Sequence, residues 1–121
     1  MLRGIRGAVT AKKNSPEEIW TAGRELVEKI VALNEIKIEN IGAIIFSSTK
    51  DLNSAFPSSG VRKNSDFQFV PLFDAQETFV ESDLPFCIRV LVLADVEKNL
   101  NEIHHVYLNG AKKLRPDFAT E

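Results

Sequence analysis

The chain has 121 residues, of which 44% are hydrophobic and 26% are charged, and this composition indicates one soluble globular domain that spans residues 1–121. The formal net charge of -2 provides no basic field, so we expect neither nucleic acid nor an anionic membrane surface as a partner. The single cysteine, Cys87, excludes an internal disulfide framework and a cysteine-rich zinc site.

The sequence shows no targeting segment and no membrane span. The N-terminal run Met1–Gly7 lacks the long apolar core of a signal peptide. No apolar segment reaches the roughly 18 residues that a spanning helix needs. We therefore expect a cytoplasmic protein.

The first predicted element is a strand over Leu2–Ala11. It contains Gly4 and Gly7, which are unusual inside a strand because glycine costs stability there and often indicates close approach by another backbone or a ligand. Arg6 lies between the two glycines and would have a clear path to such a ligand. The alternative is a solvated arginine on an edge strand.

The second predicted element is a helix that begins at Pro16. Ser15 is a good N-cap, proline suits the first helical position, and Glu17 and Glu18 face the positive end of the helix dipole. Apolar residues then recur every three or four positions until Asn34 ends the helix. This periodicity predicts a helix that packs on the core and carries no chemistry.

A second strand is predicted at Asn40–Ser48. Residues 43–46 are apolar at every position, which indicates burial on both faces of the sheet. A loop then leads to a short helix that begins at Pro57. A third strand is expected at Gln68–Leu72, where Pro71 stops it or forms a bulge.

Two acidic residues follow the third predicted strand, Asp74 and Glu77. We expect both of them on a loop just past the strand end, where binding groups are commonly placed.

The strand predicted at Pro85–Ala94 is also apolar on both faces, yet it carries one full charge, Arg89. Arginine does not lose its proton, and an unpaired buried charge costs several kcal/mol. Arg89 therefore needs an internal carboxylate, a ligand, or a path to water. Cys87 in the same run is predicted to be a buried filler rather than a nucleophile.

The C-terminal part is predicted to contain little regular structure. Residues 97–103 are polar and form at most a helical turn, and His105–Leu108 reads as a short strand. His104 and His105 have no spaced cysteine or acidic partners, so we expect no metal site. From about Lys112 onward we expect a mobile tail.

The number of helices is too small for the number of buried strands. One long helix covers one face of a small sheet, whereas two strands are apolar on both faces. The second face needs cover, and another copy of the chain can supply it. We therefore predict a homo-oligomer in which the sheets pack against each other.

Short motifs along the whole chain point to a family. They are Arg3-Gly4-Ile5-Arg6-Gly7-Ala8, Ser48-Thr49 with Asp51-Leu52, Phe56-Pro57 with Val61-Arg62, Val70-Pro71, Gln76-Glu77, Cys87-Ile88-Arg89-Val90, His105-Val106-Tyr107-Leu108 and Leu114-Arg115-Pro116-Asp117. No single motif is specific, but the ordered set resembles the monofunctional chorismate mutases of the AroH class, the type known from Bacillus.

The resemblance implies an α+β fold with a mixed β-sheet and helices on one face. It also implies a homotrimer with a central barrel-like sheet core and active sites between subunits. The implied reaction is the Claisen rearrangement of chorismate to prephenate, on the route to phenylalanine and tyrosine. This reaction needs no cofactor; it needs a dianion held in a chair-like conformation, with positive charge beside the breaking ether bond.

The resemblance also assigns roles to particular residues. Arg89 would place its guanidinium against the ether oxygen and a carboxylate of the substrate. Arg6 and Tyr107 match carboxylate-binding groups, and Glu77 matches the group that accepts the ring hydroxyl. The other expected substrate contacts are Phe56 and Leu72 as apolar walls, Ser58 and Ser59 after the Phe-Pro pair, Arg62 at the rim, Phe73 and Asp74 beside the ring, and Leu114 and Arg115 in a tail that closes over the site.

Three positions depart from the family pattern. Ser59 stands where a lysine is common, and Phe73 and Asp74 stand where Thr and Cys are common. A carboxylate at Asp74 would repel a dianion. It therefore turns away, is held by an arginine or a backbone N–H, or shares the substrate hydroxyl with Glu77.

Two alternative functions remain open at this point. One is an enzyme of the trimeric enamine/imine deaminase kind, which also places an arginine at a subunit cleft. The ordered set of Arg6, Glu77, Arg89 and Tyr107 speaks against it. The other is a non-catalytic binding module for an aromatic-pathway metabolite, which the changes at positions 59 and 74 keep open.

Overall fold

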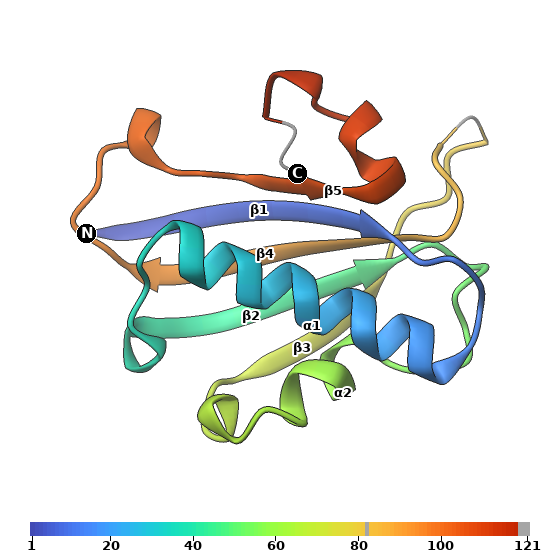
Figure 1. The fold of residues 1–121 in the computed structure, drawn as a ribbon, viewed down its shortest axis with the longest axis horizontal. Coiled ribbons are helices and arrows are strands. Elements are labelled where there is room, and N and C mark those ends of the chain that lie inside the picture. The colour runs from blue at the N-terminus through green and yellow to red at the C-terminus, as the bar shows by residue number, and fades with distance from the viewer. Residues whose placement is uncertain (82, 119–121) are drawn as a thin grey trace.

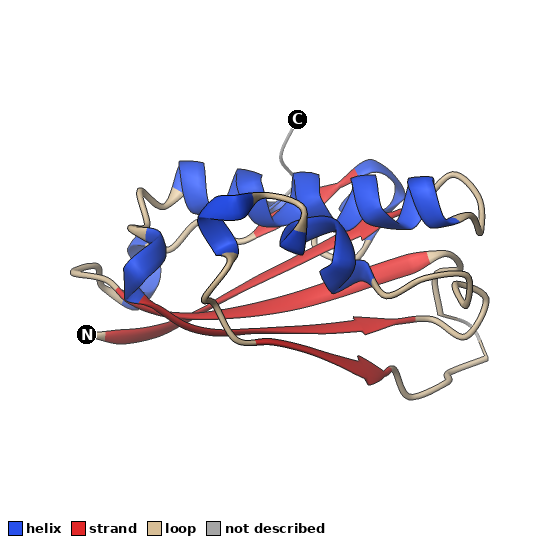
Figure 2. Cartoon of the chain, turned by 90° about the horizontal axis from the view of Figure 1, so that it is seen from below, coloured by secondary structure: helices blue, strands red, loops and turns tan. Residues whose placement is uncertain are grey.

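A computed structural model describes residues 1–81 and 83–118. Within these residues five strands form one mixed sheet in the order β3-β2-β4-β1-β5, and two α-helices lie together over one of its faces (Figures 1 and 2). The elements are β1 (Leu2–Thr10), α1 (Pro16–Leu33), β2 (Ile41–Ser48), α2 (Pro57–Arg62), β3 (Leu72–Gln76), β4 (Cys87–Asp95) and β5 (Val106–Leu108). The expected α+β fold with helices on one face of a mixed sheet is confirmed.

The long helix α1 begins and ends as the sequence predicts. The Ser15 hydroxyl accepts a hydrogen bond from the Glu18 N–H at 3.3 Å. At the other end Asn34, which is 1% exposed, donates from its side-chain amide to the carbonyls of Ile30 and His104, both at 2.9 Å. Asn34 thereby ties the end of α1 to the segment that leads into β5. In the described part of the chain, no helix has both the length and the apolar character needed to cross a bilayer.

The two faces of the sheet differ in burial. Alternate residues such as Ile5, Ile44 and Val92 are fully buried on the face that α1 covers. The residues between them point to the opposite face, where Ile45 and Leu91 are only partly buried. Within a single chain, the predicted burial of β2 and β4 on both faces is therefore confirmed only for the face that α1 covers.

The third strand lies farther along the chain than the sequence predicts. The expected strand Gln68–Leu72 is wrong, since β3 begins at Leu72, directly after Pro71. The residues before Pro71 form a turn that the Arg62 guanidinium holds by donating at 2.8–3.1 Å to three backbone carbonyls, those of Phe67, Gln68 and Val70. As a consequence Asp74 lies inside β3 rather than on a loop, and only Glu77 follows the strand.

The C-terminal segment folds back on the sheet as far as it is described. β5 pairs in parallel with β1, and two 3₁₀ turns follow at Asn109–Lys113 and Pro116–Phe118. Leu114 packs against a small buried cluster that consists of Ala8, Cys87, Tyr107 and Ala111. The predicted mobility of the tail remains a prediction, and residues 119–121 lie outside the described part of the chain.

Candidate active site

Three of the predicted site residues converge on the sheet face opposite α1. Arg6 lies on β1, Arg89 on β4 and Tyr107 on β5. The strand register brings them together, because Ala8 of β1 pairs with Arg89 on one side and with Tyr107 on the other. The three residues line a hollow of about 250 Å³.

Two internal carboxylates contact the guanidinium of Arg89. Its Nε donates to Glu77 Oε1 at 2.9 Å, and its Nη2 donates to Asp83 Oδ1 and Oδ2 at 3.0 and 3.1 Å. The Glu77 side chain is 11% exposed and that of Asp83 is 22% exposed, whereas that of Arg89 is 36% exposed. Arg89 therefore has the internal partners that a strand arginine needs and still borders the hollow.

The pKa values of the two carboxyl groups beside Arg89 are shifted in opposite directions. Burial raises the pKa of Glu77 above its ordinary value, and the attraction of Arg89 only partly offsets this. The pKa of Asp83 is lowered, first because its carboxylate accepts the Leu84 backbone N–H. Glu77 Oε2 is buried and accepts no hydrogen bond from any described residue, so it has the capacity to accept one more.

Arg6 and the C-terminal segment have further polar contacts. The Arg6 backbone N–H donates to Nδ1 of His105 at 2.9 Å, and burial lowers the pKa of His105, which favours the neutral ring that this bond requires. Arg115 donates to both carboxylate oxygens of Asp117 at 3.2 and 2.9 Å. The hydrogen bond to His105 fixes the backbone at Arg6. The residues around His105 in the sequence do not predict this role.

The cysteine of β4 is not a nucleophile. Cys87 is fully buried, and burial raises its pKa to about 12. A thiol with such a pKa stays protonated at neutral pH and is inert. The predicted role of Cys87 as a buried filler is confirmed.

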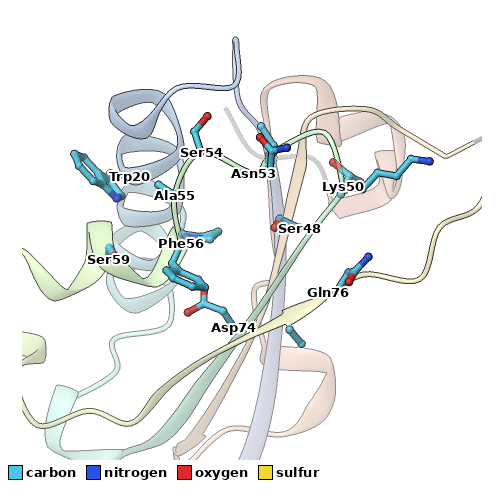
Figure 3. A pocket seen from close by; sticks show the side chains of 14 residues that line it. Trp20, Ser48, Lys50, Asn53, Ser54, Ala55, Phe56, Ser59, Asp74 and Gln76 are labelled. Atoms are coloured by element: carbon cyan, nitrogen blue, oxygen red, sulfur yellow. The ribbon is translucent and has the colours of Figure 1, made fainter.

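A second group of predicted residues lines a different and larger pocket of about 650 Å³ (Figure 3). This pocket is lined by Phe56, Ser59 and Asp74, which Figure 3 labels. Asp74 accepts hydrogen bonds from Ser58, at 3.3 Å from the backbone N–H and also from the hydroxyl. Among the alternatives for Asp74, the structure supports the one in which a backbone N–H holds it.

The remaining predicted residues lie away from Arg89. Leu72 packs against the core, and Phe73 is 63% exposed beside Ile45 on the face opposite α1. Arg62 is engaged by the carbonyls described above. Among residues 1–81 and 83–118, the pocket of Phe56 and the hollow of Arg89 share no lining residue, so the two groups lie in separate cavities of one chain.

Two residues near the site carry no signal in the sequence. Asp83 binds Arg89 although it lies on an irregular segment six positions before it, and a spacing of this kind predicts no contact. Lys50, which lines the larger pocket, lies with Nζ 3.8 Å from the centre of the Phe79 ring. Both contacts depend on how the segment after β3 folds back.

Comparison with known proteins identifies the family. Residues 2–118 match the model of the family described as chorismate mutase type I. The chain is 40% identical to chorismate mutase AroH of Bacillus subtilis (strain 168) over 119 residues, which cover 98% of this chain and 94% of that protein. It is 44% identical to chorismate mutase AroH of Thermus thermophilus over 118 residues, which cover 97% and 96% of the two chains.

A solved structure agrees with this assignment. A chorismate mutase from Clostridium thermocellum superposes with a TM-score of 0.88 at 36% sequence identity. The match covers 92% of this chain and 98% of that one. The chain therefore belongs to the type I, or AroH, family of chorismate mutases.

Proposed function

We propose that this chorismate mutase has an active site that forms between neighbouring subunits of a homotrimer. The observation that carries the proposal is the convergence of Arg6, Arg89 and Tyr107 on one hollow, from three adjacent strands. Two guanidinium groups and a phenol in one hollow suit a small dianion, because guanidinium binds carboxylates through paired hydrogen bonds.

The chemistry needs little beyond such an arrangement. The rearrangement breaks a C–O bond and forms a C–C bond within one molecule, so the protein has to hold the substrate in a chair-like conformation. As the C–O bond stretches, negative charge develops on the ether oxygen. Arg89 supplies a fixed positive charge there, and this stabilises the transition state more than the ground state.

The other residues have distinct binding roles in this proposal. Arg6 and Tyr107 bind the substrate carboxylates, and Glu77 accepts the ring hydroxyl through Oε2, the oxygen that has no hydrogen bond in the described structure. Phe56, Leu72 and Phe73 provide apolar contacts.

A further set completes the entrance of the proposed site. Its members are Ser58, Ser59, Arg62, Leu114 and Arg115, whereas Asp74 lies beside the substrate ring.

The face of the sheet opposite α1 supports assembly with other copies. It presents Ile45 and Leu91, which are partly buried, and Leu2 and Phe73, which are 70% and 63% exposed. A second copy packed there would bury this apolar surface. It would also place a second chain beside the Arg89 hollow. That chain would supply the predicted residues of the Phe56 pocket, which lie away from Arg89 within a single chain.

One assay separates this proposal from its alternatives. The purified chain is incubated with chorismate, and the loss of chorismate absorbance is compared with the prephenate formed. A deaminase leaves chorismate unchanged, and a binding module binds it without turnover. Sedimentation gives the oligomeric state in the same buffer, and a monomer that is fully active would contradict the intersubunit site.

Matched variants then locate the site. Arg89→Ala is expected to abolish most of the turnover, whereas Arg24→Ala, an equivalent change on α1, is expected to retain it. If both variants turn over chorismate like the parent, the Arg89 hollow is not the active site.

A further inference from the structure

The carboxylate of Asp83 contacts the guanidinium of Arg89, which borders the hollow. Both of its oxygens accept hydrogen bonds from Nη2 of Arg89, at 3.0 and 3.1 Å. This is the kind of contact that a substrate carboxylate makes with a guanidinium. In the free chain Asp83 thus occupies Nη2 of the guanidinium that the proposed function assigns to a dianion.

Glu77 and Asp83 hold Arg89 in different ways. Glu77 follows directly after β3, is 11% exposed, and has its Oε1 bonded both to Arg89 Nε at 2.9 Å and to the Ser47 hydroxyl at 3.3 Å. Asp83 is twice as exposed, at 22%, and it comes from an irregular segment. Glu77 therefore holds Nε from the more buried position, and Asp83 holds Nη2 from the more exposed one.

Asp83 also has open space beside it. It lines a second hollow of about 200 Å³ that is bordered by Glu77, Lys50 and Phe79. Lys50 contributes a positive charge to this second hollow, and its Nζ lies 3.8 Å from the centre of the Phe79 ring. A rotation of the Asp83 side chain away from Arg89 would move the carboxylate into this hollow, where Lys50 is the cation among the described lining residues and Asp51 and Glu81 are further carboxylates.

We propose that Asp83 is an internal competitor of the substrate, a carboxylate that occupies Arg89 in the free chain and must leave when a dianion binds. This inference rests on the proposed function and adds a residue that sets the affinity of the site.

The charges around the hollow explain the expected effect. Arg6 and Arg89 contribute two positive charges, and Glu77 and Asp83 contribute two negative ones, so these four groups sum to zero. A dianion gains little attraction from a site of zero net charge. When Asp83 loses its charge, the same four groups sum to +1 and the dianion is attracted.

The test uses the isosteric variant Asp83→Asn with Glu81→Gln as its matched control. Both variants remove one negative charge from the same segment, but the Glu81 side chain is exposed, whereas that of Asp83 is bonded to Arg89. Asparagine keeps the oxygen that accepts the Leu84 N–H, so the local fold is retained. A second variant, Asp83→Ser, also removes the carboxylate, and it shows whether an effect of Asp83→Asn comes from the asparagine itself.

For Asp83→Asn we expect the KM for chorismate to fall about tenfold while kcat stays near that of the parent, because the competitor acts only before the substrate is bound. The gain should shrink at high salt, since it is electrostatic. The control variant should behave like the parent.

A KM for Asp83→Asn that is unchanged or matches Glu81→Gln would overturn the proposal. So would a raised KM or a lowered kcat, because either result would show that Asp83 supports Arg89 instead of competing for it.

A second readout does not depend on turnover. Sulfate, a small dianion, is titrated into each protein while the ¹⁵Nε resonance of Arg89 is followed. Tighter sulfate binding in Asp83→Asn, and not in the control, supports the competitor even if the parent fails to convert chorismate. Equal binding in the parent, Asp83→Asn and Glu81→Gln refutes it even if the parent is a good mutase.

Discussion

Replacement of Arg89 by lysine tests how the proposed site works, because the positive charge remains while the guanidinium geometry is lost. In the structure two different nitrogens of Arg89 bind two different carboxylates, Nε to Glu77 and Nη2 to Asp83. A lysine has one nitrogen on a flexible stem and cannot reproduce this fork. The substitution therefore separates the effect of charge from the effect of placement.

The expected magnitude for catalysis follows from the role of a single donor. Loss of one preorganised donor at a developing charge typically lowers kcat by about 10²–10³. We expect Arg89→Lys to fall in this range, since its ammonium is drawn to Glu77 rather than to the ether oxygen. Arg89→Ala should lose more, because the full charge is removed.

The two variants differ in stability as well. Arg89→Ala leaves the carboxylate of Glu77, which is 11% exposed, without its cation. Removal of one partner from a fully buried pair costs about 3–5 kcal/mol, and we expect roughly 2 kcal/mol here because the Arg89 side chain is 36% exposed. Arg89→Lys keeps a cation beside Glu77 and should cost under about 1 kcal/mol.

The assay measures kcat and KM for chorismate beside a thermal melt for each variant. The melt separates loss of catalysis from loss of folded protein. Turnover of Arg89→Lys close to that of the parent would refute the requirement for a guanidinium fork. A large drop in melting temperature for Arg89→Lys would show instead that the fork is needed for folding.

Three further predictions concern stability and reactivity. Burial raises the pKa of Glu77, so the folded chain binds the Glu77 carboxyl proton more tightly than the unfolded chain does. The stability that this protonation contributes is complete below the ordinary glutamate pKa. It is lost as the pH rises through the raised pKa. Glu77→Gln should therefore flatten the dependence of melting temperature on pH in that window. Cys87, whose pKa is raised to about 12, should resist thiol reagents at pH values near 8 in the folded protein and react once it is unfolded. Gly60→Ala should destabilise the protein by about 1–3 kcal/mol or more, because the added carbon would lie 2.1 Å from the backbone oxygen of Trp20. Gly42→Ala, whose added carbon would meet only an ordinary contact at 3.6 Å, is its matched control.

Each of these predictions has a contrary result. A melting curve of Glu77→Gln with the same pH dependence as the parent would show that this carboxyl is not the group responsible. Rapid labelling of Cys87 in the native protein would contradict its burial. Equal stability of Gly60→Ala and Gly42→Ala would contradict the close packing of α2 on α1.

Much of the fold follows from local patterns. Ser15 and Pro16 begin α1, and the spacing of apolar residues determines which side of the helix faces the sheet. The apolar runs in β2 and β4 indicate two central strands because a buried strand needs such residues on both sides. The shift of β3 could not be predicted in this way, since Arg62 organises the turn before it through side-chain hydrogen bonds to carbonyls that carry no sequence signal.

Residue patterns alone are enough to predict the available groups: two arginines and a tyrosine on strands, and a glutamate on the loop past one of them. One of these groups, Arg89, is charged in an apolar run and therefore needs a partner. Which of these groups meet depends on the fold of the whole chain. Arg6, Arg89 and Tyr107 come together because β1 lies between β4 and β5, and Asp83 reaches Arg89 because the segment after β3 folds back. Residue chemistry is local to each position, whereas contact depends on strand order and register, and these are set by the packing of the whole chain.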